Sequence, residues 1–406
     1  MTQSEKLFIK LAAASIGKDF VSQSDADGAD TREILLLAKQ HKLLPIIYTG
    51  LKKSGIKLFT DEEEKAVKKA VIAETAFQVS RNEALLRLYD KMSSENIYPC
   101  VVKGIVLAAL YENRDMRISA DTDLLIPADI YTKAERIMLD EGLKEKEDSG
   151  EDDTVRTYIN ERNGLYIEAH TLLFPEYPSL NRKMNLLFEN AAERRIFHDI
   201  DGHKVASFSH TDHLLFLVLH SFKHFIYCGF GLRQIMDFIL YAKTFKEDID
   251  HKKIEKALDA VSAFGFFRGL LSVCKTYFFH SPTELGFDIP DSELPETDDM
   301  IADILSGGIY GGNTEERLHS SKMTLAAADK NKKVSFLSSL FPSADALSHQ
   351  YTYLKKHKIL LPAAWFSRIV RHMKKDRSSA GKFDPEESIE IGKERISMMR
   401  KYGIIK

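Results

Sequence analysis

The chain has 406 residues, of which 44% are hydrophobic and 29% charged, and its formal net charge is −3. This length exceeds one average domain, so we expect two or three domains, and the apolar content suffices for sizeable cores. Three distant cysteines without a Cys-x-x-Cys pattern argue against a disulfide framework or a zinc site and fit a reducing cytoplasm (Cys100, Cys228 and Cys274).

The first part of the chain is predicted to be helical. Lys10 interrupts the apolar patch at 7–16, so we expect no signal peptide. Residues 4–56 show broad apolar helix faces. Residues 61–96 contain no proline or glycine, and their apolar side chains recur at helical spacing, which indicates packing. We therefore expect N-terminal helices over residues 1–84.

A mixture of short strands and helices follows over about residues 85–208. The predicted elements are strands at 100–103 and 123–126, helices at 105–112 and 128–141, a hairpin of 155–160 with 165–170, and an edge strand at 203–207. Asn163-Gly164 divides the two hairpin strands. The pattern predicts a small α+β core with a mixed sheet.

Residues 209–406 are predicted to form a larger helical domain. Apolar runs such as 214–219 are too short to span a bilayer, so we expect no stable membrane insertion. Residues 313–406 hold 19 Lys and Arg against 10 Asp and Glu, a local charge of +9 that leaves −12 for residues 1–312. This basic third could meet RNA, a membrane surface or an acidic partner, or form a solvated helix face. Its apolar residues, including Trp365, predict helix near the active cleft.

Paired acids mark the candidate site. Asp121 and Asp123 stand at i and i+2, so they point to the same face of a strand. Adjacent carboxylates repel unless a cation lies between them, and Mg²⁺ is the usual cation beside a triphosphate. Glu168 supplies a third acid on a later strand, either as a ligand or as a base. We predict that these three acids converge on one Mg²⁺ site, with Mn²⁺ as the alternative ion.

Four ordered blocks resemble a bacterial family of uncharacterised nucleotidyltransferases within the DNA polymerase β-type superfamily. The blocks are Lys103-Gly104, Arg-x-x-x-Asp-x-Asp at 117–123, acid-x-His at 168–170, and His-x-x-Lys-His with Gly-x-Arg-x-x-x-Asp at 220–237. A later run at 360–368 is also similar, so the resemblance covers roughly residues 30–370. Lys-Gly stands where better-known members of the superfamily have Gly-Ser.

The resemblance implies a nucleotidyltransferase core and a metal-dependent enzyme that moves a nucleoside monophosphate from an NTP to a hydroxyl. Two metal ions would clamp the attacking oxygen and the leaving pyrophosphate. The acceptor could be a small molecule, a tRNA end or a protein side chain. Related enzymes include toxins of toxin–antitoxin systems, so a tRNA- or protein-modifying toxin is one alternative.

The blocks also imply nucleotide-binding residues. Gly104 would open a helix N-terminus toward phosphate, while Lys103 either neutralises phosphate or extends to solvent. Arg117 would fork onto triphosphate oxygens or pair with an acid. Ser119 would bond phosphate or cap the turn. We predict that Lys223 reaches the β- and γ-phosphates from the helical domain.

Five further residues are predicted to support the site. His170 would orient an acid, touch substrate or fill the core. His220 and His224 share a helix face with Lys223, and a zinc site there is disfavoured because no third ligand is nearby. Arg233 and Asp237, at i and i+4, are predicted to form a helix ion pair.

The sequence is also compatible with two other function classes. Asp-x-Asp also binds Mn²⁺ and a nucleotide-sugar in glycosyltransferases, but those folds place a parallel βαβ half before the motif. The region before Asp121 is mostly helical, which disfavours this class. A non-catalytic nucleotide-binding module is the other alternative, although all three acids are present.

Overall fold

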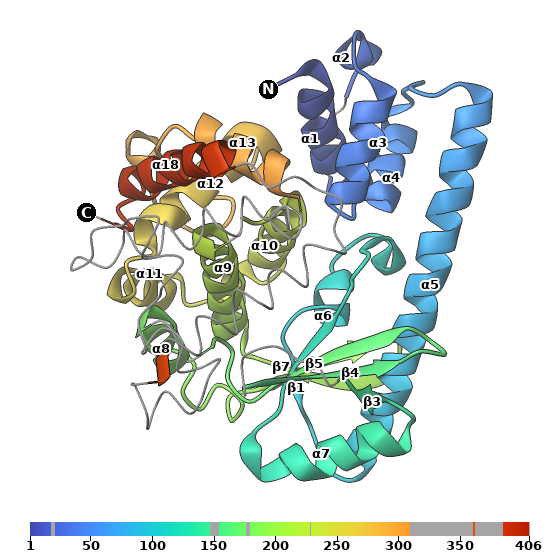
Figure 1. Ribbon diagram of the computed structural model, residues 1–406, viewed down its shortest axis with the longest axis vertical. Coiled ribbons are helices and arrows are strands. Elements are labelled where there is room, and N and C mark those ends of the chain that lie inside the picture. Colours follow the sequence, from blue (N-terminus) through green and yellow to red (C-terminus); the bar gives the residue numbers. More distant parts are fainter. Residues whose placement is uncertain are drawn as a thin grey trace.

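The computed structural model describes residues 1–17, 21–146, 154–175, 179–227, 229–308, 360–361 and 385–405. The chain begins with the expected helices, drawn in blue in Figure 1: α1 (Gln3–Ser15), α2 (Gln23–Ala26), α3 (Thr31–Gln40), α4 (Leu44–Ser54) and the long α5 (Asp61–Ser94). Thr60 begins α5 with a capping box to Glu63. No helix among the described residues is long and apolar enough to cross a membrane.

A five-stranded mixed sheet follows α5, in the order β1-β2-β5-β4-β3. The strands are β1 (Cys100–Val101), β2 (Thr122–Leu125), β3 (Lys144–Glu145), β4 (Val155–Asn160) and β5 (Leu165–His170). β2 and β5 pair in parallel, and the other neighbours are antiparallel. The predicted hairpin is confirmed as β4 and β5, and the α+β class is confirmed with it.

The sheet has one apolar face and one polar face. Side chains on the apolar face pack against α5 and α7 (Ala128–Asp140) in a buried cluster with Leu124, Ile167 and Ala169. Because side chains alternate along a strand, Asp123 and Glu168 point to the opposite face. α7 and α6 (Ile105–Ala108) lie on opposite sides of the sheet (Figure 1).

The prediction of a helix over 105–112 is wrong in its length. α6 ends at Ala108, and the 3₁₀ turn η1 (Arg114–Met116) follows. The Tyr111 hydroxyl donates to the Asp237 carboxylate of a later helix at 2.8 Å, so a tertiary hydrogen bond holds the segment after α6. That contact outweighs the local helix preference.

Residues 203–207 form a strand, but in a separate two-stranded sheet. β7 (His203–Ser207) pairs with β6 (Ile196–Ile200), which the sequence analysis did not predict. The Ser207 hydroxyl donates to the Val101 carbonyl at 2.7 Å and fixes this hairpin to the edge of the main sheet.

Helices make up most of the described residues after β5. They are α8 (Ser179–Leu186), α9 (His210–Tyr227), α10 (Leu232–Thr244), α11 (His251–Ala260), α12 (Phe264–Phe278), α13 (Asp298–Gly307) and α18 (Pro385–Lys401), with short 3₁₀ turns at Lys246–Asp248 and Asp291–Glu293. One apolar cluster joins α1, α3 and α4 to α9, α10, α12 and α13. α1 therefore contacts α10 and α12 despite their distance in sequence.

α18 is anchored to this helical layer by a buried arginine. Arg395 donates to Asp303 of α13 at 2.8 Å and to the Phe225 carbonyl of α9. The basic clusters at 355–358 and 374–377, and Trp365, lie outside the described residues. The predicted position of the basic third near the cleft stays a prediction.

Candidate functional site

The register of β2 and β5 brings two acids side by side. Asp123 is paired with Glu168, and Leu125 is paired with His170. Paired residues of parallel neighbours project to the same face of the sheet. Along β5, buried Leu165, Ile167 and Ala169 alternate with half-buried residues, and Glu168 and His170 belong to the second set. The register of the β2–β5 pair, together with the alternation of side chains along each strand, therefore places Asp123, Glu168 and His170 together.

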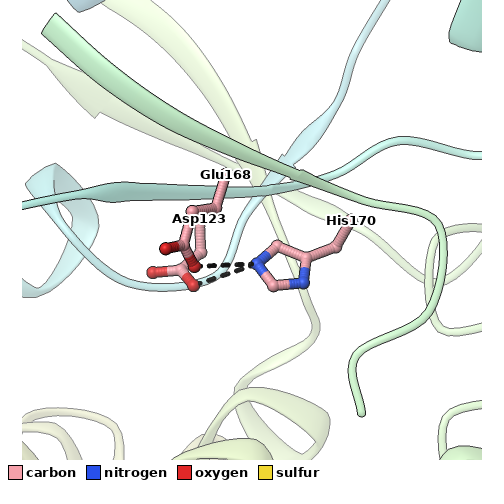
Figure 2. A group of neighbouring side chains, drawn as sticks. All are labelled: Asp123, Glu168 and His170. Atoms are coloured by element: carbon pink, nitrogen blue, oxygen red, sulfur yellow. Dashed lines mark hydrogen bonds and ion pairs between the residues drawn. The ribbon is translucent and has the colours of Figure 1, made fainter. Parts of the chain in front are cut away.

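Asp123, Glu168 and His170 form a compact group of possible metal-binding side chains (Figure 2). His170 Nε2 lies 3.1 Å from Asp123 Oδ1 and 3.6 Å from Glu168 Oε2. One ligand-capable atom from each residue lies within 4.8 Å of the other two. Metal–oxygen bonds of about 2.1 Å would require only small movements of these side chains.

His170 acts on the two carboxylates as a charged neighbour. Burial would lower its pKa, but hydrogen bonds to Asp123 and Glu168 outweigh burial and raise the pKa of His170 to about 8. The second ring nitrogen, Nδ1, is buried and has no hydrogen-bond partner among the described residues. The donor set is oxygen-rich, which fits Mg²⁺ or Mn²⁺ held by the carboxylates, with His170 orienting them.

Lys103 reaches the same group from the β1–α6 turn. Its ammonium lies 2.8 Å from Asp123 Oδ2 and 3.1 Å from His220 Nε2. Burial acts to lower the pKa of Lys103, whereas Asp123 and Asp121 outweigh it and raise the pKa. Burial acts to raise the pKa of Asp123, yet Lys103 and His170 hold it well below its usual range. Lys103 is therefore a site residue and does not extend to solvent.

Asp121 lies at the edge of the acid group, one residue before β2 begins. It is half-buried, and burial followed by the charge of Asp123 raises its pKa above the usual value. The compact metal-binding group comprises Asp123, Glu168 and His170. Asp121 as a further ligand stays a prediction.

Gly104 forms the turn that aims Lys103 at the acids. Its φ of 63° and ψ of −121° lie in a region that residues with a Cβ rarely adopt. The Val102 N–H donates to the Asp123 carbonyl at 3.2 Å, which ties the approach to this turn to β2. The helix that follows has only four residues and is shorter than expected, and phosphate binding at its N-terminus stays a prediction.

Arg117 and Asp237 form a buried ion pair, and a contact of Arg117 with triphosphate stays a prediction. Arg117 donates from Nε and Nη2 to the two Asp237 oxygens at 2.7 and 2.6 Å, and it also donates to the Gly104 carbonyl at 3.3 Å. Asp237 therefore pairs with Arg117, whereas the sequence predicted its pairing with Arg233. Arg233 instead donates to the Ile118 carbonyl. Helix α10 is thereby linked to the segment before β2.

Polar residues of α5 hold the same segment from the other side. The Gln78 carbonyl oxygen accepts from the Ser119 N–H at 2.8 Å, and Arg81 donates to the Ser119 and Ala120 carbonyls. The Ser119 hydroxyl donates to the Asp121 carbonyl at 2.8 Å, as a turn cap would. Sequence analysis missed Gln78, Arg81 and Asn82, although polar residues at i, i+3 and i+4 within an apolar helix face are a usable signal.

Two histidines of α9 face Lys103. His224 Nε2 lies 3.2 Å from His220 Nε2, and burial lowers the pKa of both rings well below the usual value. Both are therefore neutral, and the charge of Lys223 acts on each of them. Among the residues that the structure covers, the only three-ligand group is the one around Asp123, so no zinc site is found at His220 and His224. The role of Lys223 at the triphosphate stays a prediction.

The family comparison agrees with this geometry. A family model described as an uncharacterised nucleotidyltransferase matches residues 27–279. No curated protein and no solved structure matches the chain. The matched range contains the Asp123 group, Lys103 and the α9 histidines.

Proposed function

The chain belongs to the uncharacterised nucleotidyltransferase family, and from that premise we propose that it transfers a nucleoside monophosphate from an NTP to a hydroxyl group. The observation that carries this proposal is the pairing of Asp123 with Glu168 on adjacent parallel strands, beside His170 and Lys103. Acids in a buried strand are costly unless a cation offsets them.

In the proposed reaction the acceptor oxygen attacks the α-phosphorus of the NTP. A new P–O bond forms while the bond to the bridging oxygen breaks, and pyrophosphate leaves with the electron pair. The hydroxyl proton passes to a carboxylate, for which Glu168 is suited because it is half-buried and lies beside Asp123.

The acids Asp121, Asp123 and Glu168 are the proposed ligands of a divalent cation, Mg²⁺ or Mn²⁺. Such an ion would supply Lewis-acid stabilisation of the phosphoryl oxygens. His170 would orient the two paired carboxylates, and Lys103 would add positive charge beside the triphosphate. Arg117 and Asp237 would hold the segment before β2 in place.

The fold offers no support for a nucleotide-sugar glycosyltransferase. That class requires a parallel βαβ half before the Asp-x-Asp motif. Among the described residues, six α-helices, a 3₁₀ turn and the two-residue strand β1 precede Asp121, and β1 is antiparallel to β2. Release of pyrophosphate from an NTP, rather than of sugar from a nucleotide-sugar, is the expected reaction.

The test is incubation of the protein with each α-labelled NTP, a divalent cation and a cell lysate. We expect one class of molecule to become labelled: a small molecule, a tRNA or a protein. The identity of the labelled species names the acceptor. Binding of Mg²⁺-NTP without label on any molecule would instead favour a non-catalytic binding module.

A further inference from the structure

The two oxygens of Asp123 face two different nitrogen-bearing side chains. Oδ1 lies 3.1 Å from His170 Nε2, on the side shared with Glu168, while Oδ2 lies 2.8 Å from Lys103 Nζ. Asp123 is only 4% exposed, so both contacts are sheltered from water. The Asp123 carboxylate thus lies between Lys103 on one side and the Glu168–His170 part of the site on the other.

Lys103 is held on its side of Asp123 by two acceptors. Its ammonium donates to Asp123 and to His220 Nε2, which lies on α9 at 3.1 Å. An ammonium can only donate, so His220 Nε2 is the acceptor of this hydrogen bond and adds no positive charge beside it. A lysine ammonium is a compact point charge, unlike the planar guanidinium of arginine.

In two-metal sites a pair of cations about 3.5–4 Å apart clamps the attacking and leaving oxygens. We propose that Lys103 takes the place of one of these cations, so that the site binds one divalent ion, on the Oδ1 side of Asp123 with Glu168. His220 is then a positioning residue that keeps the ammonium on Oδ2. This inference rests on the proposed function and replaces the expectation of two metal ions.

The direct test counts ions in the wild-type protein. Native mass spectrometry of the full chain with Mn²⁺ and inorganic tripolyphosphate reports the number of ions per complex, independently of the base preference. We expect one Mn²⁺ per complex. Two ions would overturn this inference and leave the proposed function standing, whereas none would overturn the metal site of the proposed function itself.

Variants test the role of the ammonium. Lys103→Met keeps the length of the side chain and removes its charge, so tripolyphosphate affinity at low Mn²⁺ should fall about tenfold or more. High Mn²⁺ should restore part of this affinity, because a second ion can enter the vacated position. The matched control, Lys133→Met on the exposed face of α7, should leave affinity unchanged. Unchanged affinity in Lys103→Met, at an unchanged thermal midpoint, would contradict the proposal.

A double-mutant cycle tests His220. His220→Phe should weaken tripolyphosphate binding on its own, but it should add little in the Lys103→Met background, because both changes remove the same ammonium. Additive losses would show that His220 acts independently of Lys103 and would overturn its positioning role.

Discussion

Asp237 is the residue that closes the polar network beside the site. It accepts two hydrogen bonds from Arg117 and one from the Tyr111 hydroxyl, and both members of the ion pair are almost fully buried. A buried ion pair is weak evidence for stability in itself, but removing one partner leaves an uncompensated charge. Removing Asp237 alone should therefore destabilise the protein more than removing both charges of the pair.

Asp237→Ala should lower the free energy of unfolding by about 3–5 kcal/mol, because it leaves the Arg117 guanidinium buried without its partner. The double variant Arg117→Met with Asp237→Leu should recover most of the loss, since it removes both charges. Urea denaturation measures the free energy of unfolding of both variants. A loss below about 1 kcal/mol for Asp237→Ala would show that Arg117 finds another partner or becomes hydrated.

For single residues, the sequence predicted the acids of the site better than it predicted which charged side chains pair with each other. Asp123 and Glu168 could be found because acids within apolar strand segments are unusual. The pairing of Arg117 with Asp237 could not, because 120 residues separate them and only the tertiary fold brings them together. The local i, i+4 rule instead suggested Arg233, whose guanidinium reaches the Ile118 carbonyl.

The turn between β1 and α6 depends on the backbone conformation of Gly104. A Cβ at Gly104 would meet no atom within 4 Å, so substitution there tests backbone strain without a steric clash. Gly104→Ala should cost about 1–3 kcal/mol of unfolding free energy and weaken tripolyphosphate binding, because the turn aims Lys103. Isothermal titration calorimetry measures the binding.

Gly202→Ala provides the matched control for that substitution. Gly202 lies in the β6–β7 turn at φ 83°, and a Cβ there would also meet no neighbouring atom. This variant should lose stability but keep tripolyphosphate affinity. Equal affinity losses in both variants would mean that lowered stability, rather than the Gly104 turn, explains the effect.

Helices and strands with a regular spacing of apolar residues were predicted well, whereas elements whose bounds depend on tertiary contacts were not. The 34-residue helix α5 and the β4–β5 hairpin follow from uninterrupted helical spacing and from Asn163-Gly164. β6 was missed because its partly exposed, mixed sequence at 196–200 shows little alternation. The short α6 depends on Tyr111, whose partner lies on α10.

His41 follows α3 and links the N-terminal helices to α10 and α13 by two hydrogen bonds. His41 Nε2 lies 3.3 Å from the Leu305 carbonyl, and Nδ1 accepts from the Leu232 N–H at 3.4 Å. Burial lowers the pKa of His41 from 6.5 to about 4. Protonation of Nδ1 would place its N–H opposite the Leu232 N–H in a buried position, so the hydrogen bond between these two atoms would be lost.

This junction predicts acid sensitivity with a defined sign. Neutral His41 contributes stability that is fully present above pH 6.5 and falls as the pH drops toward about 4, because the unfolded chain binds the proton first. The contribution amounts to about 3 kcal/mol. His41→Gln can keep both hydrogen bonds without titrating, so between pH 7 and pH 4.5 it should lose about 2–3 kcal/mol less than the wild type in urea denaturation. Parallel pH profiles would contradict this role.

We propose that the Asp123–Glu168 pair carries out metal-assisted nucleotidyl transfer. The most direct measurement is the rate of label transfer from an α-labelled NTP to its acceptor for the wild type, Asp123→Asn, Glu168→Gln and the control Asp140→Asn, whose exposed carboxylate lies on α7. We predict that the first two variants lose about a thousandfold or more in rate, with unchanged thermal midpoints, while Asp140→Asn keeps the wild-type rate. Wild-type transfer by a folded Asp123→Asn protein would contradict a catalytic role of this carboxylate pair.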